Sequence, residues 1–279
     1  MQIEFQRPVC STPAVCNKIS DAANKVPKAR AFNLVDIRNM LIKSRGIVLH
    51  TLKYNDAGCI VDILTREEGF QSFFVRISRG KRGGLKSAFF QPLTAVDIEW
   101  NHKPTSNLQT LRSVSPHPML GLERPEKITL ALFLAEFLRT ALRSEPIAAP
   151  LFDYTWDSIE WLNLSEQHFS NFHLVFLLRM THFLGFYPNL ANYADGMYFD
   201  LENSSFVRHQ PLHSHYLDPA DAAFLPTLMR MQPATMHLFK FSGARRTRLL
   251  RFIVTYYQLH LPAFGELKSL NVLEAVFQD

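Results

Sequence analysis

The sequence predicts a multi-domain β + α protein, in which a small antiparallel β domain is followed by a mostly helical domain. Between residues 43 and 115 apolar residues recur with a period near two, which is typical of half-buried strands. Beyond Pro116, Pro118 and Pro125 the apolar period becomes that of an amphipathic helix. The chain has 279 residues, of which 47% are hydrophobic, so it can build two hydrophobic cores.

The first 39 residues differ from the rest of the chain. They show little periodicity and are interrupted by Pro8, Pro13 and Pro27. They contain no apolar run behind a basic start, so they are not a secretory signal. Met40 stands immediately before a strong strand pattern. We therefore expect residues 1–39 to be a poorly ordered, non-native extension, with Met40 as the true start.

The β domain is expected over residues 40–116, with strands at 44–54, 59–65, 70–78, 93–100 and 108–114. Gly69 ends the turn between the second and third strands, where it supplies the positive φ that such turns often need. Five short antiparallel strands in about 75 residues suit an OB-fold barrel. An SH3-like barrel or a small sandwich is the alternative, because counting strands does not separate these folds.

The helical domain is expected over residues 117–279. Its first helix begins near Pro125, and its predicted buried stripe consists of Ile128, Ala131, Leu132, Ala135, Leu138 and Leu142. A second helix follows Pro150, and a third over 169–184 is apolar nearly all round and belongs at the centre of the domain. Residues 187–217 are expected to be an irregular insert, after which helices resume at 219–231, 245–260 and 269–277.

Composition and charge restrict the function. No apolar run approaches the roughly 20 residues of a membrane-spanning helix, and the three cysteines, Cys10, Cys16 and Cys59, fit a reducing compartment. We therefore expect a cytoplasmic protein with no membrane contact.

The net charge of +5 divides into +3 over residues 1–39, +5 over 40–116 and −3 over 117–279. A basic β domain indicates a polyanion as partner, although a solvated basic surface explains the charge equally well.

The densest chemical feature is a basic loop between the third and fourth strands. It has no acid, and its glycines leave backbone N–H groups accessible to phosphate. Aromatic side chains nearby could stack on bases, although most of them should be core. The order of residues is not that of a phosphate-binding P-loop. We interpret the region as a nucleic-acid-binding surface, with candidate residues Arg76, Arg79, Lys81, Arg82 and Lys86, and Lys43 and Arg45 on the first strand.

Two other clusters allow several interpretations. Arg245, Arg246, Arg248 and Arg251 begin a helix, where they form either a solvated face or a contact for DNA or an acidic partner. His209, His213 and His215 crowd the insert, but no cysteine is near and the sequence does not define where the carboxylates lie, so we expect no metal there. No catalytic triad, nucleophile elbow or zinc-protease motif is present. The sequence therefore predicts a protein that is not an enzyme.

Several segments together resemble the RecO family of bacterial recombination mediators. They are residues 45–56 (RGIVLHTLKYND), 63–69 (ILTREEG), the basic loop at 79–87, 91–93 (QPL), 183–190 (FLGFYPNL) and 267–270 (LKSL). The resemblance extends over about residues 40–279. It implies an N-terminal OB fold, a helical C-terminal domain, and a role in DNA repair and recombination that consumes no nucleotide.

The resemblance further implies that the protein binds single- and double-stranded DNA and anneals complementary strands. With RecR it would help to load RecA onto DNA coated by the single-stranded-DNA-binding protein, SSB, and it would associate with the nucleoid. A pocket for the SSB C-terminal tail belongs in the helical domain, with Arg139, Arg143 and the cluster at 245–251 as candidates for its rim. Many members carry a four-cysteine zinc site, but residues 191–198 contain no cysteine, so we expect no cofactor. The alternatives are an RNA-binding OB protein and a non-catalytic protein adaptor.

Overall fold

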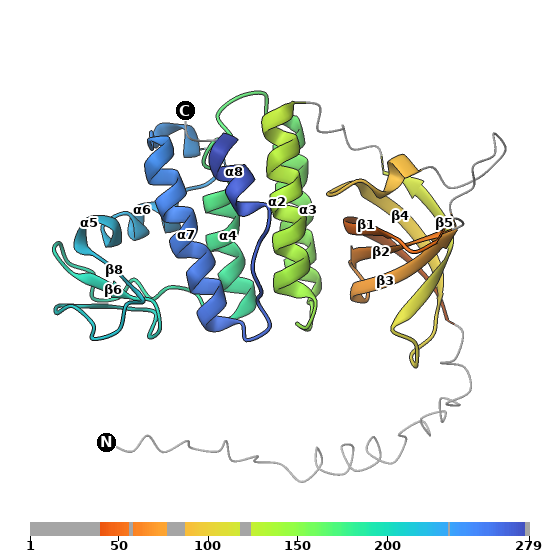
Figure 1. The fold of residues 1–279 in the computed structure, drawn as a ribbon, viewed down its shortest axis with the longest axis horizontal. Coiled ribbons are helices and arrows are strands. Elements are labelled where there is room, and N and C mark those ends of the chain that lie inside the picture. Colours follow the sequence, from red (N-terminus) through yellow and green to blue (C-terminus); the bar gives the residue numbers. More distant parts are fainter. Residues whose placement is uncertain (1–39, 56–57, 77–86, 118–123, 234, 277–279) are drawn as a thin grey trace, which may run out of the picture. The chain divides into compact units, whose positions relative to one another are not determined.

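The computed structural model describes residues 40–55, 58–76, 87–117, 124–233 and 235–276 (Figure 1). The expectations for residues 1–39 lie outside this part of the chain and stay predictions. Each helix in these ranges is too short or too polar to span a lipid bilayer.

Five strands close into a barrel, which confirms the predicted N-terminal OB-type fold (Figure 1). They pair in the order β1-β2-β3-β5-β4, and all neighbours are antiparallel except β3 and β5, which are parallel. Their bounds are β1 Met40–Lys53, β2 Gly58–Thr65, β3 Gly69–Arg76, β4 Ala95–His102 and β5 Leu108–Pro116. Between β3 and β4 lies the short 3₁₀ helix η2, Ser87–Phe90. The turn between β2 and β3 has Gly69 at a φ of +62°, as the sequence predicts.

The length of β1 allows the barrel to close. Its first half pairs with β4 and its second half with β2, and the two ladders overlap at Gly46 and Ile47. A Cβ atom on Gly46 would lie 2.7 Å from a methyl group of Ile63, so glycine permits the close approach of β1 and β2. Trp100 and Phe73 fill the interior with their rings 5.4 Å apart, edge to face.

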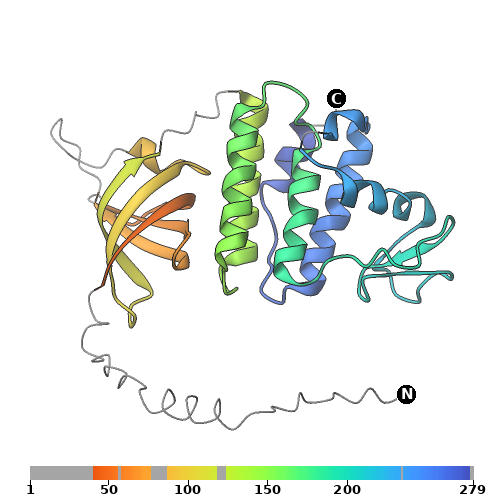
Figure 2. The same cartoon turned by 180° about the vertical axis from the view of Figure 1, so that it is seen from behind.

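The rest of the described chain is mostly helical, as the sequence predicts (Figure 2). The helices are α2 Pro125–Leu142, α3 Ala149–Leu164, α4 Phe172–Leu184, α5 Pro219–Ala222, α6 Leu225–Arg230, η3 Met236–Leu238, α7 Gly243–His260 and α8 Leu270–Val276. α4 is buried on nearly all sides, so its predicted central place is confirmed. It ends at Gly185, whose φ of +84° suits a helix C-terminus.

The predicted buried stripe of α2 is wrong at two positions. Ile128 and Leu132 are 44% and 48% exposed, whereas Phe133, Leu134 and Phe137 are buried. α2 contacts strand β1 and helix α8, and its buried residues belong to a core that includes Leu49 and other barrel side chains. Which side of α2 is buried therefore depends on its packing against β1 and α8. The apolar period of the helix does not identify these two neighbours.

The predicted irregular insert contains a small sheet instead. Its strands are β6 Tyr198–Asp200, β7 Ser205–Val207 and β8 Tyr216–Leu217, paired in the order β7-β6-β8. Strands of two or three residues are too short to show an apolar period, so the sequence pattern misses them. The sheet has its own apolar cluster, in which Phe199, Phe206 and Leu217 pack with Tyr256 of α7.

Candidate nucleic-acid interface

Among the basic candidates between residues 76 and 86, the structure describes only Arg76. Arg76 is the last residue of β3, is exposed, and makes no ion pair with any residue in the described ranges. Arg79, Lys81, Arg82 and Lys86 lie outside the described residues, so their candidacy stays a prediction. The structure does show which surface the loop leaves from, because Arg76 pairs with Gly58 at the end of the β2–β3 ladder.

An aromatic pair lies on that surface. Tyr54 is 65% exposed, and its ring meets that of half-buried Phe74 edge to face, with the ring centroids 6.1 Å apart. Phe74 precedes Arg76 by two residues and therefore shares its face of β3. Phe73 and Phe90, by contrast, are core residues, as we expected for most aromatic side chains near the loop. Tyr54 and Phe74 are accessible for stacking.

Backbone register explains why the pair forms. Leu52 of β1, Ile60 of β2 and Phe74 of β3 are aligned across three strands, and all three point away from the barrel core. A Cβ atom on Gly58 would lie 2.7 Å from the Phe74 ring, so the absence of a side chain allows the ring to lie over β2. The N–H of Tyr54 donates to the Gly58 carbonyl at 3.1 Å, which turns the chain and brings Tyr54 to the Phe74 ring.

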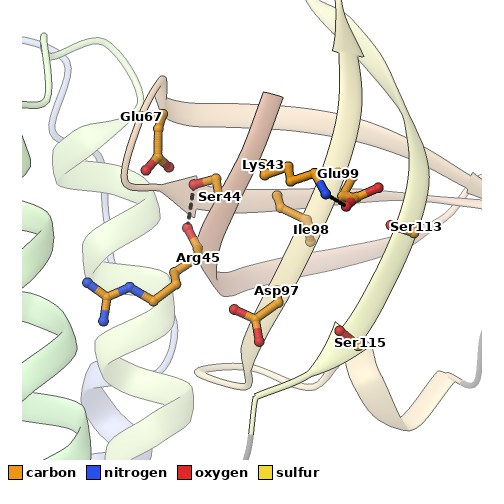
Figure 3. Close-up of a pocket in the computed structure, with 9 residues that line it drawn as sticks. All are labelled: Lys43, Ser44, Arg45, Glu67, Asp97, Ile98, Glu99, Ser113 and Ser115. Atoms are coloured by element: carbon orange, nitrogen blue, oxygen red, sulfur yellow. Dashed lines mark hydrogen bonds and ion pairs between the residues drawn. The ribbon is translucent and has the colours of Figure 1, made fainter. Parts of the chain in front are cut away.

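Lys43 lies in a different environment, a hollow of about 360 Å³ on the barrel (Figure 3). Its Nζ is 2.7 Å from Oε1 of Glu99, and this contact holds the pKa of the Glu99 carboxyl below its usual value. Asp97 and Glu67 line the same hollow. Because the lining includes three carboxylates and only two cations, Lys43 and Arg45, the hollow offers no net attraction to phosphate.

Arg45 extends from the same strand toward the helices and away from the other residues drawn (Figure 3). Its guanidinium lies over the Trp156 ring, 4.8 Å from the centroid, and 3.6 Å from a carboxylate oxygen of Asp153. Arg66 donates to both oxygens of Asp153, at 2.7 and 2.9 Å, and thereby lowers the pKa of that carboxyl. Arg45 therefore belongs to a contact between the barrel and α3.

The two candidate cations at the end of α2 differ. Arg139 donates from Nε to Oδ2 of Asp62 at 2.7 Å and is engaged with the barrel. Arg143 is exposed and lines a second hollow, of about 450 Å³, with Lys103 of the β4–β5 loop. Gln109 holds that loop in shape, since its amide nitrogen donates to the carbonyl of Lys103 at 2.9 Å and to that of Ser106 at 2.7 Å.

Sequence reasoning missed Lys103. Lys103 lies in the turn between two predicted strands. It is a single lysine there, whereas the basic loop was recognised by several cations close together. Its position matters because OB folds bind oligonucleotides on the face of strands 2 and 3 and on the β1–β2 and β4–β5 loops. Tyr54 and Phe74 lie at one end of this face, and Lys103 and Arg143 lie at the hollow beside Ser72 of β3.

The arginines of the α7 cluster mostly contact other residues of the helical part. Arg248 pairs with Asp218 at 3.0 Å and Asp221 at 2.5 Å, and Arg251 makes two 2.7 Å hydrogen bonds to Glu274. Arg246 donates to the carbonyl of Phe241 and is half-buried, which lowers its pKa, and Arg245 lies over the Phe224 ring at 4.3 Å. These contacts connect α7 to α5, α8 and the segments between them.

The chain is an OB-fold protein: a closed barrel with an accessible aromatic and basic face is followed by a helical part. The barrel matches the family model described as "Recombination protein O N terminal" over residues 40–118, and the helical part matches "Recombination protein O C terminal" over residues 122–271. The chain belongs to the RecO family. Membership places it among DNA repair proteins and not among enzymes, in agreement with the sequence prediction.

Curated relatives match this chain along their whole length. Proteins named DNA repair protein RecO from Phocaeicola vulgatus and Bacteroides fragilis are 48% and 47% identical to this chain. The RecO protein of Christiangramia forsetii is 29% identical. In each case the match covers 85% of this chain and 100% of the relative.

A four-cysteine zinc site does not fit the described residues. The one free cysteine among them is Cys59, which is buried in the barrel core. Residues 191–198, where the resemblance would put the ligands, contain no cysteine.

Proposed function

We propose that this chain binds single- and double-stranded DNA on the β2–β3 face of its barrel, anneals complementary strands, and with RecR helps to load RecA onto SSB-coated single-stranded DNA. The observation that carries the proposal is the accessible Tyr54–Phe74 pair beside Arg76, at the point where the basic loop leaves the barrel. Such a protein acts in the cytoplasm, associated with the nucleoid.

The physical basis is electrostatic and requires no covalent step. Cations of the loop neutralise phosphates on two strands at once, which lowers the repulsion that opposes annealing. Aromatic faces stack on bases of any sequence, as annealing without sequence preference requires. Tyr54 and Phe74 provide such faces, and Arg76 provides a cation that no described carboxylate neutralises.

Partner capture would belong to the helical part. An acidic, apolar-ended SSB tail needs a cation that is not already paired with a carboxylate. Arg143 meets this requirement within the described residues, whereas Arg139, Arg248 and Arg251 are in ion pairs. Of the other two α7 candidates, Arg246 is half-buried and Arg245 is engaged with the Phe224 ring. We therefore favour the end of α2 over the α7 cluster as the rim of the tail site. Binding of a labelled tail peptide should weaken in Arg143→Ala and not in Arg208→Ala, which removes another exposed cation.

The test of DNA binding is fluorescence anisotropy of the full chain with a labelled single-stranded oligonucleotide across a salt series. Replacing Arg79, Lys81, Arg82 and Lys86 together with Ala should reduce the slope of log K against log salt by up to about 3, since each phosphate contact on single strands contributes about 0.7. A matched control removes four exposed cations of the helical part, Arg208, Arg230, Lys240 and Lys268, and should leave the slope unchanged.

Two results would contradict the proposal. Equal slopes for the loop variant and the control would remove the loop from the interface. Salt-independent, weak binding by the unaltered chain would favour a protein adaptor. RNA of the same length and sequence serves as the competing ligand, and a clear preference for it would favour the RNA-binding alternative.

A further inference from the structure

Outside the barrel, three side chains that can bind a metal converge on the small sheet. They are Glu202, which follows β6, and His213 and His215, which precede β8. One ligand atom from each lies within 4.8 Å of the other two. Oε1 of Glu202 is 2.8 Å from Nδ1 of His215 and 3.6 Å from Nδ1 of His213. From the sequence we expected no metal, because no cysteine is near and the sequence does not place a carboxylate beside the histidines.

These separations approach those of a tetrahedral site. Zinc binds histidine nitrogen at about 2.0–2.1 Å and carboxylate oxygen at about 2.0–2.2 Å, so neighbouring ligand atoms are about 3.4 Å apart. The 3.6 Å separation already fits. In the 2.8 Å contact the Nδ1–H of His215 donates to the Glu202 carboxylate. Metal binding at Nδ1 must therefore displace this proton, which moves to Nε2 or is released, and must widen the separation by about 0.6 Å. Both side chains are more than 40% exposed, so they are free to make that movement.

The tautomer of His213 suits a ligand. Its Nδ1 accepts a hydrogen bond from the backbone N–H of His215 at 3.2 Å, so Nδ1 is unprotonated, and a metal ion would take its lone pair by displacing this hydrogen bond. Its other ring nitrogen, Nε2, therefore bears the proton and is 3.4 Å from Oδ1 of Asp200. Metal-binding histidines usually donate their second nitrogen to a carboxylate in this way, which fixes the ring orientation.

Asp200 is itself held in place without a metal. It is 5% exposed and accepts hydrogen bonds from the backbone N–H groups of Glu202 and Asn203 and from the Asn203 side chain, at 2.8–3.1 Å. The two segments are also joined through the backbone, because the N–H of Leu201 donates to the carbonyl of His215 at 3.0 Å. The arrangement is thus organised by contacts that are independent of the three candidate ligands' side chains.

We propose that Glu202, His213 and His215 form a site for a divalent metal ion of the zinc type, with Asp200 as the carboxylate that orients His213. Two imidazoles and one carboxylate are ligands that zinc accepts, and the exposure of the site leaves its fourth position to water. The ion would connect the chain after β6 to the chain before β8. A sheet whose strands have two or three residues gains stability from such a crosslink.

The test uses the full chain without a histidine tag, treated with chelator and titrated with ZnCl₂ by calorimetry and with CoCl₂ by visible absorption. We expect one tight equivalent with the absorption of tetrahedral Co²⁺. His215→Ala and Glu202→Gln change exposed side chains and should each abolish that equivalent. His209→Ala removes an exposed histidine of the same segment that lies outside the cluster, and should leave it intact.

Asp200→Asn tests the orienting carboxylate and should weaken zinc affinity about 10- to 100-fold. Circular dichroism of every variant shows whether it is folded, and His215→Ala is expected to remain folded because its side chain is 43% exposed. The proposal is overturned if the unaltered chain binds no zinc. It is also overturned if His215→Ala and Glu202→Gln bind as tightly as His209→Ala does.

Discussion

Arg139 of α2 donates a 2.7 Å hydrogen bond from Nε to Oδ2 of Asp62 on β2, which joins the helix to the barrel through an ion pair. Asp62 is 5% exposed, and its other oxygen accepts from the Ser72 hydroxyl at 2.6 Å. His50 lies 3.9 Å from Oδ2, and burial, with Arg139 next in importance, lowers the pKa of its imidazole. The carboxylate is therefore balanced mainly by Arg139, whose guanidinium is not available to a partner in this structure.

Arg139→Ala should lower the free energy of unfolding by about 2–3 kcal/mol, because it leaves a buried carboxylate with one hydroxyl partner. Arg143→Ala, one turn further along the helix, removes an exposed cation that pairs with no carboxylate of the described residues, and should change stability by less than about 0.5 kcal/mol. Urea unfolding at neutral pH measures both. Equal effects of the two variants would show that the Asp62 pair contributes nothing.

Tyr54→Ala should weaken binding of single-stranded DNA by about 1–3 kcal/mol, the contribution of one base stacked on an aromatic ring. Tyr54→Phe keeps the ring and should retain the affinity, and Leu52→Ala removes a neighbouring exposed apolar side chain without a π face and should change little. Anisotropy at one fixed salt concentration gives the comparison. Loss of affinity in Tyr54→Phe equal to that in Tyr54→Ala would argue against stacking.

Glu136 of α2 holds the start of α8. Burial opposes its ionisation, but hydrogen bonds from the Ser269 hydroxyl and from the N–H groups of Ser269 and Lys268 outweigh burial and lower the pKa of its carboxyl. A pKa lower in the folded than in the unfolded state means that the carboxylate stabilises the fold above the unfolded value of about 4.3. This contribution is lost as the pH falls through the folded pKa.

Glu136→Gln should therefore be less stable than the unaltered chain at pH 7, because an amide group faces N–H donors that required a carboxylate. The difference in unfolding free energy should shrink as the pH falls below about 4.3. Urea unfolding of both proteins over this pH range gives the curve. A difference that stays constant with pH would show that the lost stability is unrelated to the charge of Glu136.

Gly69→Ala should lower the free energy of unfolding by about 1–2 kcal/mol, because residue 69 has a positive φ that alanine adopts at a cost. The new Cβ would also lie 2.9 Å from Cβ of Ile147, next to α3. Gly185→Ala is the matched control: its φ is also positive, but no atom in the described part of the chain lies within 4 Å of the added Cβ. Thermal unfolding should show the larger loss in Gly69→Ala, and an equal loss would exclude the contact with Ile147.

The barrel was predictable because its strands and turns are indicated by residues that are close together in the sequence. Period-two patterns identify β2 and β3 within a few residues, and Gly69 marks the turn between them. The parallel pairing of β3 with β5 was not predictable from such patterns, because it joins strands separated by η2 and β4. The same reason explains the small sheet at β6–β8, whose short strands have no period.

For the candidate site too, the sequence predicted what depends on neighbouring residues and not what depends on tertiary contacts. The sequence alone indicated the RecO family and a basic loop, because both depend on residues that are neighbours in the chain. It did not show which cations remain unpaired, because an ion pair depends on two residues that folding brings together. Arg139 and Asp62 are 77 positions apart, and Arg66 and Asp153 are 87 apart. Only the tertiary structure decided that these arginines join the barrel to the helices, while Tyr54, Phe74 and Arg76 remain accessible at its surface.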